Sequence, residues 1–120
     1  MASEAQVLKT LRSLCLPLPE ASETRSFGHP TFKAGRKTLC VLERYGGRLT
    51  VALPVGHDAQ RALLTDTRRF QRTPYVGQHG WVSLIVDGPL DKELLAGLVR
   101  QAYEQVALRR MLAKLAERGG

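Results

Sequence analysis

With 120 residues, the chain is long enough to form one domain with a single hydrophobic core, and we expect one domain over residues 1–120. Its composition, 43% hydrophobic and 24% charged, excludes a disordered or fibrous protein. The sequence lacks the roughly eighteen consecutive apolar residues of a membrane span, and its first residues do not have the regions of a signal peptide. We therefore expect a cytoplasmic protein with no membrane partner.

The net charge of +7 is concentrated in the middle of the chain. Residues 25–72 hold ten Lys or Arg against three carboxylates, those of Glu43, Asp58 and Asp66. Such a cluster favours a polyanion, because phosphates are attracted to the positive field and release counterions on binding. An equally good interpretation is an Arg-rich composition that serves only solubility, and the sequence leaves both open.

The first helix is predicted over residues 4–15. Ser3 and Gln6 match a capping box, in which the Ser hydroxyl accepts a backbone N–H while the Gln side chain accepts one in return. Pro17 and Pro19 then end the apolar stripe, since proline lacks the N–H donor that a helix needs.

Short β-type runs separated by glycine turns fill residues 23–53 and indicate an antiparallel meander. Gly46 and Gly47 predict a type I′ turn that pairs residues 37–44 with residues 48–53. A second turn at Gly35-Arg36 pairs residues 31–34 with the same central strand.

The two-residue turn fixes the register of the main hairpin, so that Arg44 faces Leu49 and Leu42 faces Val51. One face of this hairpin is apolar and predicts helices packed over it. The apolar face carries Cys40, Leu42, Val51 and Leu53, and the candidate open face carries Leu39, Val41, Glu43, Arg48 and Thr50.

Beyond the hairpin, Asp58 predicts the start of a short helix over residues 59–65, followed by a polar loop. A strand follows over residues 80–86, and Asp91 caps a long amphipathic helix. The fold class is therefore α+β: an antiparallel sheet meander with two terminal helices packed on one face, plus one short helix between strands.

Four passages resemble the MmcQ/YjbR-like family: Leu18-Pro-Glu-Ala, Phe27-Gly-His-Pro-Thr-Phe-Lys, Pro74-Tyr-Val-Gly-Gln-His-Gly-Trp-Val and Asp87-Gly-Pro. The resemblance implies the CyaY-like, or frataxin-like, fold and a DNA-binding role through a double-wing arrangement of hairpins. The wing tips would then be Gly35-Arg36-Lys37 and Tyr45-Gly-Gly-Arg48. Family members often have Ala-Pro-Lys near the C-terminus, where this chain has Ala107-Leu108-Arg109. Without that proline, we expect the last helix to continue towards Glu117.

For non-sequence-specific DNA binding, the candidate residues are cations that would contact phosphates without reading bases. The same residues could equally form a solvated basic edge that prevents strand-to-strand aggregation. They are Lys33, Arg36, Lys37, Arg44, Arg48, Arg68, Arg69 and Arg72.

A second hypothesis is a pocket protein that holds a small anionic or aromatic ligand near His29, Tyr75, His79 and Trp81. This hypothesis leaves open that His29 and His79 converge in the fold. The same aromatic run could instead be a tight turn packed on the core, with Gly77 and Gly80 at positive φ.

A third hypothesis is a protein-interaction role through the C-terminal helix, either as a monomer with another protein or as a weak dimer. Its apolar stripe continues past the expected core through Leu108, Met111, Leu112 and Leu115.

Residues that would define an active site or a metal site are not recognisable in the sequence. The three His have no helical i, i+4 pairing and no ligand-spaced partner, and Ser26, Ser83 and Glu23 show no catalytic motif. Cys15 and Cys40 lack CxxC spacing and are interpreted as reduced, small apolar side chains. We therefore expect a binding module without a cofactor or metal, and not an enzyme.

Overall fold

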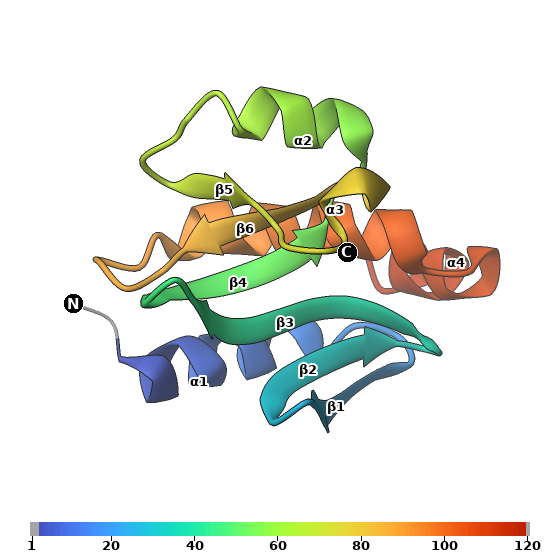
Figure 1. Cartoon of the computed structure of the whole chain (residues 1–120). Coiled ribbons are helices and arrows are strands. Elements are labelled where there is room, and N and C mark those ends of the chain that lie inside the picture. Colours follow the sequence, from blue (N-terminus) through green and yellow to red (C-terminus); the bar gives the residue numbers. More distant parts are fainter. Residues whose placement is uncertain (1–2, 120) are drawn as a thin grey trace.

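A computed structural model describes residues 3–119 of the chain, which form helices around one antiparallel sheet (Figure 1). The elements follow one another in the expected order, with helices at both ends and a short helix between strands. They are α1 (Glu4–Cys15), β1 (Ala21–Ser26), β2 (His29–Ala34), β3 (Lys37–Tyr45), β4 (Arg48–Pro54), α2 (His57–Leu63), β5 (Phe70–Arg72), the 3-10 turn η1 (Gly77–His79), β6 (Trp81–Ile85), α3 (Lys92–Val106) and α4 (Arg109–Glu117).

The sheet has six strands in the order β1-β2-β3-β4-β6-β5, and every neighbouring pair is antiparallel. The α+β class is therefore confirmed. The meander continues only to β4, because β6 pairs with β4 and β5 forms the edge beyond β6. Strand β5 was not predicted: it has three residues, of which only Phe70 is apolar, and it lacks the alternation that identifies a strand.

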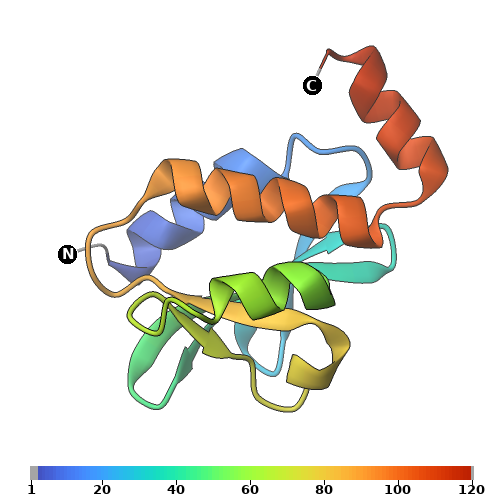
Figure 2. The same ribbon diagram turned by 90° about the horizontal axis from the view of Figure 1, so that it is seen from above.

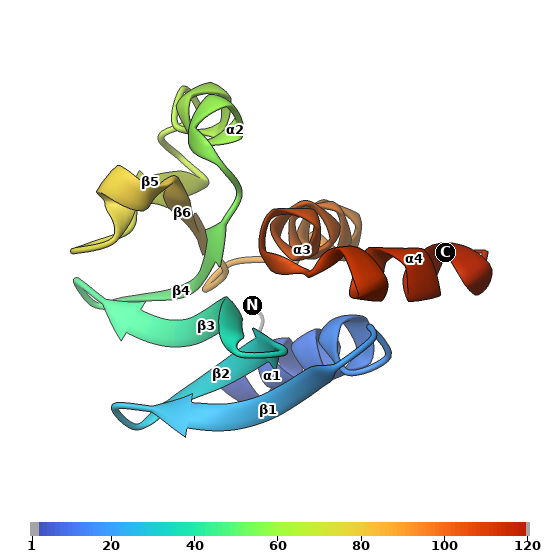
Figure 3. The same cartoon turned by 90° about the vertical axis from the view of Figure 1, so that its right-hand side faces the viewer.

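Helices α1 and α3 cover one face of the sheet, as predicted (Figures 2 and 3). The apolar stripes of both helices enter one core together with the predicted inner face of the hairpin. Tyr103 of α3 ties the core to the first loop, since its buried hydroxyl donates a 2.8 Å hydrogen bond to the carbonyl of Pro19. The core includes Val7, Leu11, Cys40, Leu42, Val51, Leu53, Leu95, Leu98 and Val99.

The central hairpin has the predicted turn and register. Gly46 and Gly47 have φ of 59° and 79°, as a type I′ turn requires, and Leu42 pairs with Val51. The assignment of Leu39 to the open face was wrong, because the register shifts between Phe32 and Lys33 and leaves Leu39 as an extra residue turned into the core.

Local capping signals located two helices correctly. The capping box of Ser3 and Gln6 is formed in both directions, and Asp91 accepts a hydrogen bond from the N–H of Leu94. The start of the short helix was wrong: α2 begins at His57 after Gly56, and Asp58 lies inside it, paired with Arg61.

The last helix does not continue to Glu117 as predicted. Helix α3 ends at Val106, Ala107 and Leu108 are extended, and α4 begins at Arg109 in a new direction (Figure 2). The break lets Met111 and Leu115 pack back onto the chain, where both are buried. Over residues 3–119, none of the helices has the length and apolarity needed to cross a membrane.

Candidate nucleic-acid interface

The turns of an antiparallel sheet alternate between its two ends, and this alternation separates the candidate residues. The β2–β3 turn at Gly35-Arg36 lies at one end, together with the start of β6 at Trp81; we name this the Arg36 end (Figure 1). The β1–β2 and β3–β4 turns lie at the other, which we name the Arg48 end. The two turns predicted as wing tips are therefore at opposite ends of the sheet.

At the Arg48 end, most predicted cations are held by carboxylates. Arg48 forms a bidentate pair with Asp87, with N–O distances of 2.7 and 3.0 Å. Arg69 lies 2.8 Å from Asp66, and Arg44 lies 3.5 Å from Glu4 of α1. These pairs reduce the net positive field of this end, although each contributes little stability because it is exposed.

The pKa values of the carboxyl groups show the same pairing. The hydrogen-bonded guanidinium of Arg48 lowers the pKa of Asp87 below its ordinary value. The guanidinium of Arg69 does the same for Asp66. Arg68 is the remaining predicted cation of this end, and it has no carboxylate partner within residues 3–119.

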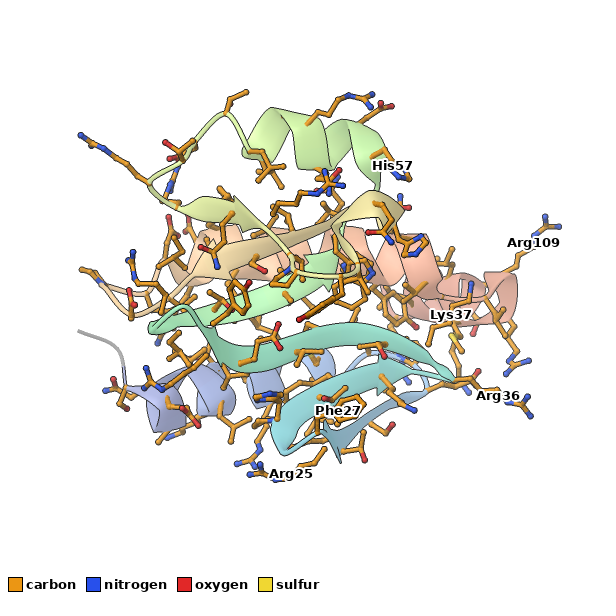
Figure 4. All side chains as sticks on the ribbon, in the orientation of Figure 1. Arg25, Phe27, Arg36, Lys37, His57 and Arg109 are labelled. Carbon is orange, nitrogen blue, oxygen red and sulfur yellow. The ribbon has the colours of Figure 1, made fainter. Side chains whose placement is uncertain are left out.

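The Arg36 end differs, because its predicted cations are not paired. Arg36, Lys37 and Arg72 are exposed, Lys33 is half-buried, and none of the four has an ion-pair partner in the described part of the chain. Arg109 at the start of α4 projects at the same end (Figure 4). Sequence reasoning missed Arg109, since a continuous helix was expected there; the only available signal was its place in the departure from the family pattern.

Helix α4 is fixed by packing against the β2–β3 turn and by an ion pair with Glu20, which immediately precedes β1. The guanidinium of Arg110 lies 2.8 Å from each carboxylate oxygen of Glu20. A Cβ on Gly35, whose φ is 61°, would lie 2.6 Å from the Met111 methyl group. A cavity of about 530 Å³ lies at this junction and is lined by Glu20, Ala34, Gly35, Arg36, Lys37, Val106, Leu108, Arg110 and Met111.

The loop between β5 and β6, residues 73–80, carries Tyr75 and His79 at the Arg36 end. Two buried groups hold this loop: the Gln60 amide donates to the carbonyls of Gly77 and Trp81 at 2.6 and 2.7 Å, and the Thr73 hydroxyl lies 2.9 Å from that of Ser83. Tyr75 and His79 are exposed, while Trp81 is half-buried.

The four residues of the predicted ligand pocket do not form one site. His29 begins β2 at the Arg48 end, whereas Tyr75, His79 and Trp81 lie at the Arg36 end. The suggestion that His29 and His79 converge was therefore wrong. The histidine that does contact the loop is His57, whose Nε2 lies 2.9 Å from the carbonyl oxygen of Gln78.

Cys15 and Cys40 are both buried, with their sulfur atoms 3.8 Å apart. The hydrogen bond with Cys15 and burial raise the pKa of the Cys40 thiol well above its ordinary value, so the reactive thiolate is disfavoured. Within residues 3–119, no three His, Cys, Asp or Glu side chains gather in a group that could hold a metal ion.

The class defined by this arrangement is a small α+β protein with a twisted antiparallel sheet, helices on one face and, within residues 3–119, a group of unpaired cations at the Arg36 end. A solved structure with the same fold is protein DR2400 of Deinococcus radiodurans, described with the domain DUF419. It superposes with a TM-score of 0.75 over 97% of this chain and 92% of that chain, at 23% sequence identity.

The sequence model of the YjbR family matches residues 16–105, and the chain therefore belongs to the YjbR family. The matched range contains the whole sheet and α2, and ends one residue before the end of α3. Helix α4 and Arg109 lie beyond it. No curated protein matches the chain.

Proposed function

We propose that this protein is a DNA-binding module without enzymatic activity, which contacts phosphates through the Arg36 end without reading the base sequence. The observation that carries the proposal is that Arg36 and Lys37, at an exposed turn, have no carboxylate partner within residues 3–119. Lys33, one residue before the end of β2, and Arg109, at the start of α4, extend the same group of cations. Phosphate contacts from Lys and Arg supply most of non-specific DNA affinity.

The paired arginines of the Arg48 end support the same choice of end. A phosphate that binds Arg48 would have to displace or approach Asp87, which already accepts hydrogen bonds from Nε and Nη2 of the guanidinium. A phosphate that binds Arg36 or Lys37 has no paired carboxylate to displace within residues 3–119. The proposal therefore includes three of the cations identified in the sequence and adds Arg109.

The number of phosphate contacts determines how strongly DNA affinity should depend on salt. With four phosphate contacts, the logarithm of the binding constant should fall with a slope of about −3.6 against the logarithm of the salt concentration. Between about 50 and about 200 mM salt, that slope corresponds to a loss of affinity of roughly 100- to 200-fold.

The test is fluorescence anisotropy of a labelled duplex titrated at both salt concentrations. Arg36→Glu/Lys37→Glu should abolish most binding. Lys9→Glu/Lys92→Glu is the matched control, because it makes the same change in net charge at exposed residues on α1 and α3. The proposal is wrong if the wild-type protein does not bind at low salt, or if both double variants weaken binding equally.

A further inference from the structure

Tyr75 combines an exposed aromatic ring with a left-handed backbone conformation, as Phe27 in the β1–β2 turn also does. Its side chain is 91% exposed, and its backbone has a φ of 66°. A bulky residue with positive φ is a backbone outlier, and such conformations cost free energy that the surrounding structure must offset. Since an exposed ring has few contacts with its own chain, folding alone does not explain why a tyrosine occupies this position.

Hydrogen bonds hold the backbone on both sides of Tyr75 along the chain. On one side, the buried hydroxyls of Thr73 and Ser83 lie 2.9 Å apart. On the other side, the buried Gln60 amide donates to Gly77 at 2.6 Å. The Tyr75 side chain takes part in neither contact. The loop is therefore pre-organised to present the ring, which reduces the entropy that a ligand must offset on binding.

A cation lies beside the same loop. A Cβ on Gly77 would lie 2.6 Å from both Cγ and Nε of Arg72, so the Arg72 side chain runs directly over the backbone of Gly77. Arg72 is exposed and has no carboxylate partner in the described part of the chain. Gln78 and His79, which follow in the same loop, are also exposed.

We propose that the loop of residues 73–80 binds an unpaired nucleobase, with the base stacked on the Tyr75 ring and an adjacent phosphate on Arg72. Proteins that bind single strands combine cations that follow the backbone with aromatic rings on which bases stack. A base inside a duplex does not offer its face to this ring. The inference rests on the proposed function and makes single-stranded nucleic acid the preferred ligand over duplex.

A nucleobase fits this surface better than an apolar protein side chain does. Besides Tyr75, the exposed residues between Arg72 and Gly80 are Arg72, Gln78 and His79, all polar or charged, and the apolar Pro74 and Val76 are half-buried. A protein interface normally has an apolar centre. The exposed aliphatic side chains Leu16 and Leu108 lie in other elements of the fold, after α1 and before α4.

The test uses labelled oligonucleotides of about ten nucleotides, single-stranded and duplex, at low salt. Tyr75→Asn removes the ring and suits the backbone, because asparagine tolerates positive φ. It should weaken single-strand binding by roughly 5- to 150-fold, the range measured for the loss of one stacked base, and leave duplex binding unchanged. Tyr75→Phe keeps the ring and should bind like the wild type. With 2-aminopurine in the strand, base fluorescence should be quenched by the wild type and not by Tyr75→Asn.

Phe27 provides the matched control. Its side chain is 101% exposed and its φ is 52°, but it lies in the β1–β2 turn at the Arg48 end. Phe27→Asn makes the same kind of change and should leave single-strand binding unaltered. Equal losses in the two asparagine variants, or no loss in Tyr75→Asn, would overturn the stacking site while leaving the phosphate site at Arg36 intact. A wild-type protein that does not bind the duplex at low salt would overturn the proposed function as well.

Discussion

Gln60 of α2 is the buried polar group on which the geometry of the β5–β6 loop most depends. It is 4% exposed, and its amide nitrogen donates to two backbone carbonyls, those of Gly77 and Trp81. Gln60→Met keeps the size of the side chain and removes both donors. Two hydrogen bonds at about 0.5–1.5 kcal/mol each give an expected loss of about 2 kcal/mol in the free energy of unfolding.

Urea unfolding followed by circular dichroism measures this loss, and the midpoint should fall with no change in slope. For a domain of this size, the same loss lowers the melting temperature by roughly 6–8 °C. Gln78→Met is the matched control, because Gln78 lies exposed in the same loop and its side chain makes no hydrogen bond in the described structure. A loss below about 0.5 kcal/mol for Gln60→Met, the size typical of surface substitutions, would refute the reasoning.

Three further outcomes follow from local features. Phe27→Asn should stabilise the protein by about 0.5–1 kcal/mol in urea unfolding, because asparagine adopts the left-handed backbone at φ 52° more readily than phenylalanine; an unchanged midpoint would contradict this. Tyr103→Phe leaves the Pro19 carbonyl without its donor and should cost about 1–2 kcal/mol, measured in the same way. The third outcome concerns acid. Arginine partners lower the folded pKa of several carboxyl groups below the ordinary 4.5 of Glu and 3.8 of Asp, so their contribution to stability is present above those values and is lost as the pH falls through the folded values. Melting temperatures between about pH 5 and pH 2.5 should decline accordingly, and a smaller decline is expected when Arg110→Gln removes one partner. The carboxyl groups are those of Glu20, Glu23, Asp66 and Asp87.

The features predicted correctly from the sequence depend on residues close together in the chain. The capping box joins residues three apart, and the type I′ turn needs only Gly46 and Gly47. Once the turn is fixed, the register of the hairpin and its apolar face follow from the alternation of side chains. Local rules were therefore sufficient for the fold class and for most element boundaries.

The features predicted wrongly depend on contacts between distant segments. Leu39 turns inward because of a bulge that pairing with β2 determines, and nothing in the local pattern of β3 marks it. Helix α3 ends at Val106 although Ala107 and Leu108 could continue a helix. The first turn of α4 is instead held by Met111 against Gly35 and by the pair of Arg110 with Glu20, which is 90 residues away.

The candidate site shows the same limit. In the composition, Arg48 and Arg36 count as equal cations. In the fold, Asp87, which is 39 residues after Arg48, pairs with Arg48 and not with Arg36. The strand order likewise decides which cations share an end, and it cannot be derived from the charge of residues 25–72. The sequence therefore identified the residue types of the candidate site, while their grouping at one end could be seen only from the strand order.

The cations of the Arg36 end come from two different segments of the chain. Lys33, Arg36 and Lys37 lie within residues 16–105, the range that the YjbR family model matches, whereas Arg109 comes from α4 beyond it. Because Met111 packs against the β2–β3 turn and Arg110 pairs with Glu20, whose carbonyl accepts a hydrogen bond from Gly35 of that turn, Arg109 is held at the end where the other cations lie. If Arg109 contributes one of four phosphate contacts, removing its charge should reduce the salt slope of DNA binding by about 0.9 and leave the remaining contacts in place. A larger reduction would mean that α4 also positions the cations of the β2–β3 turn, and does not only supply Arg109.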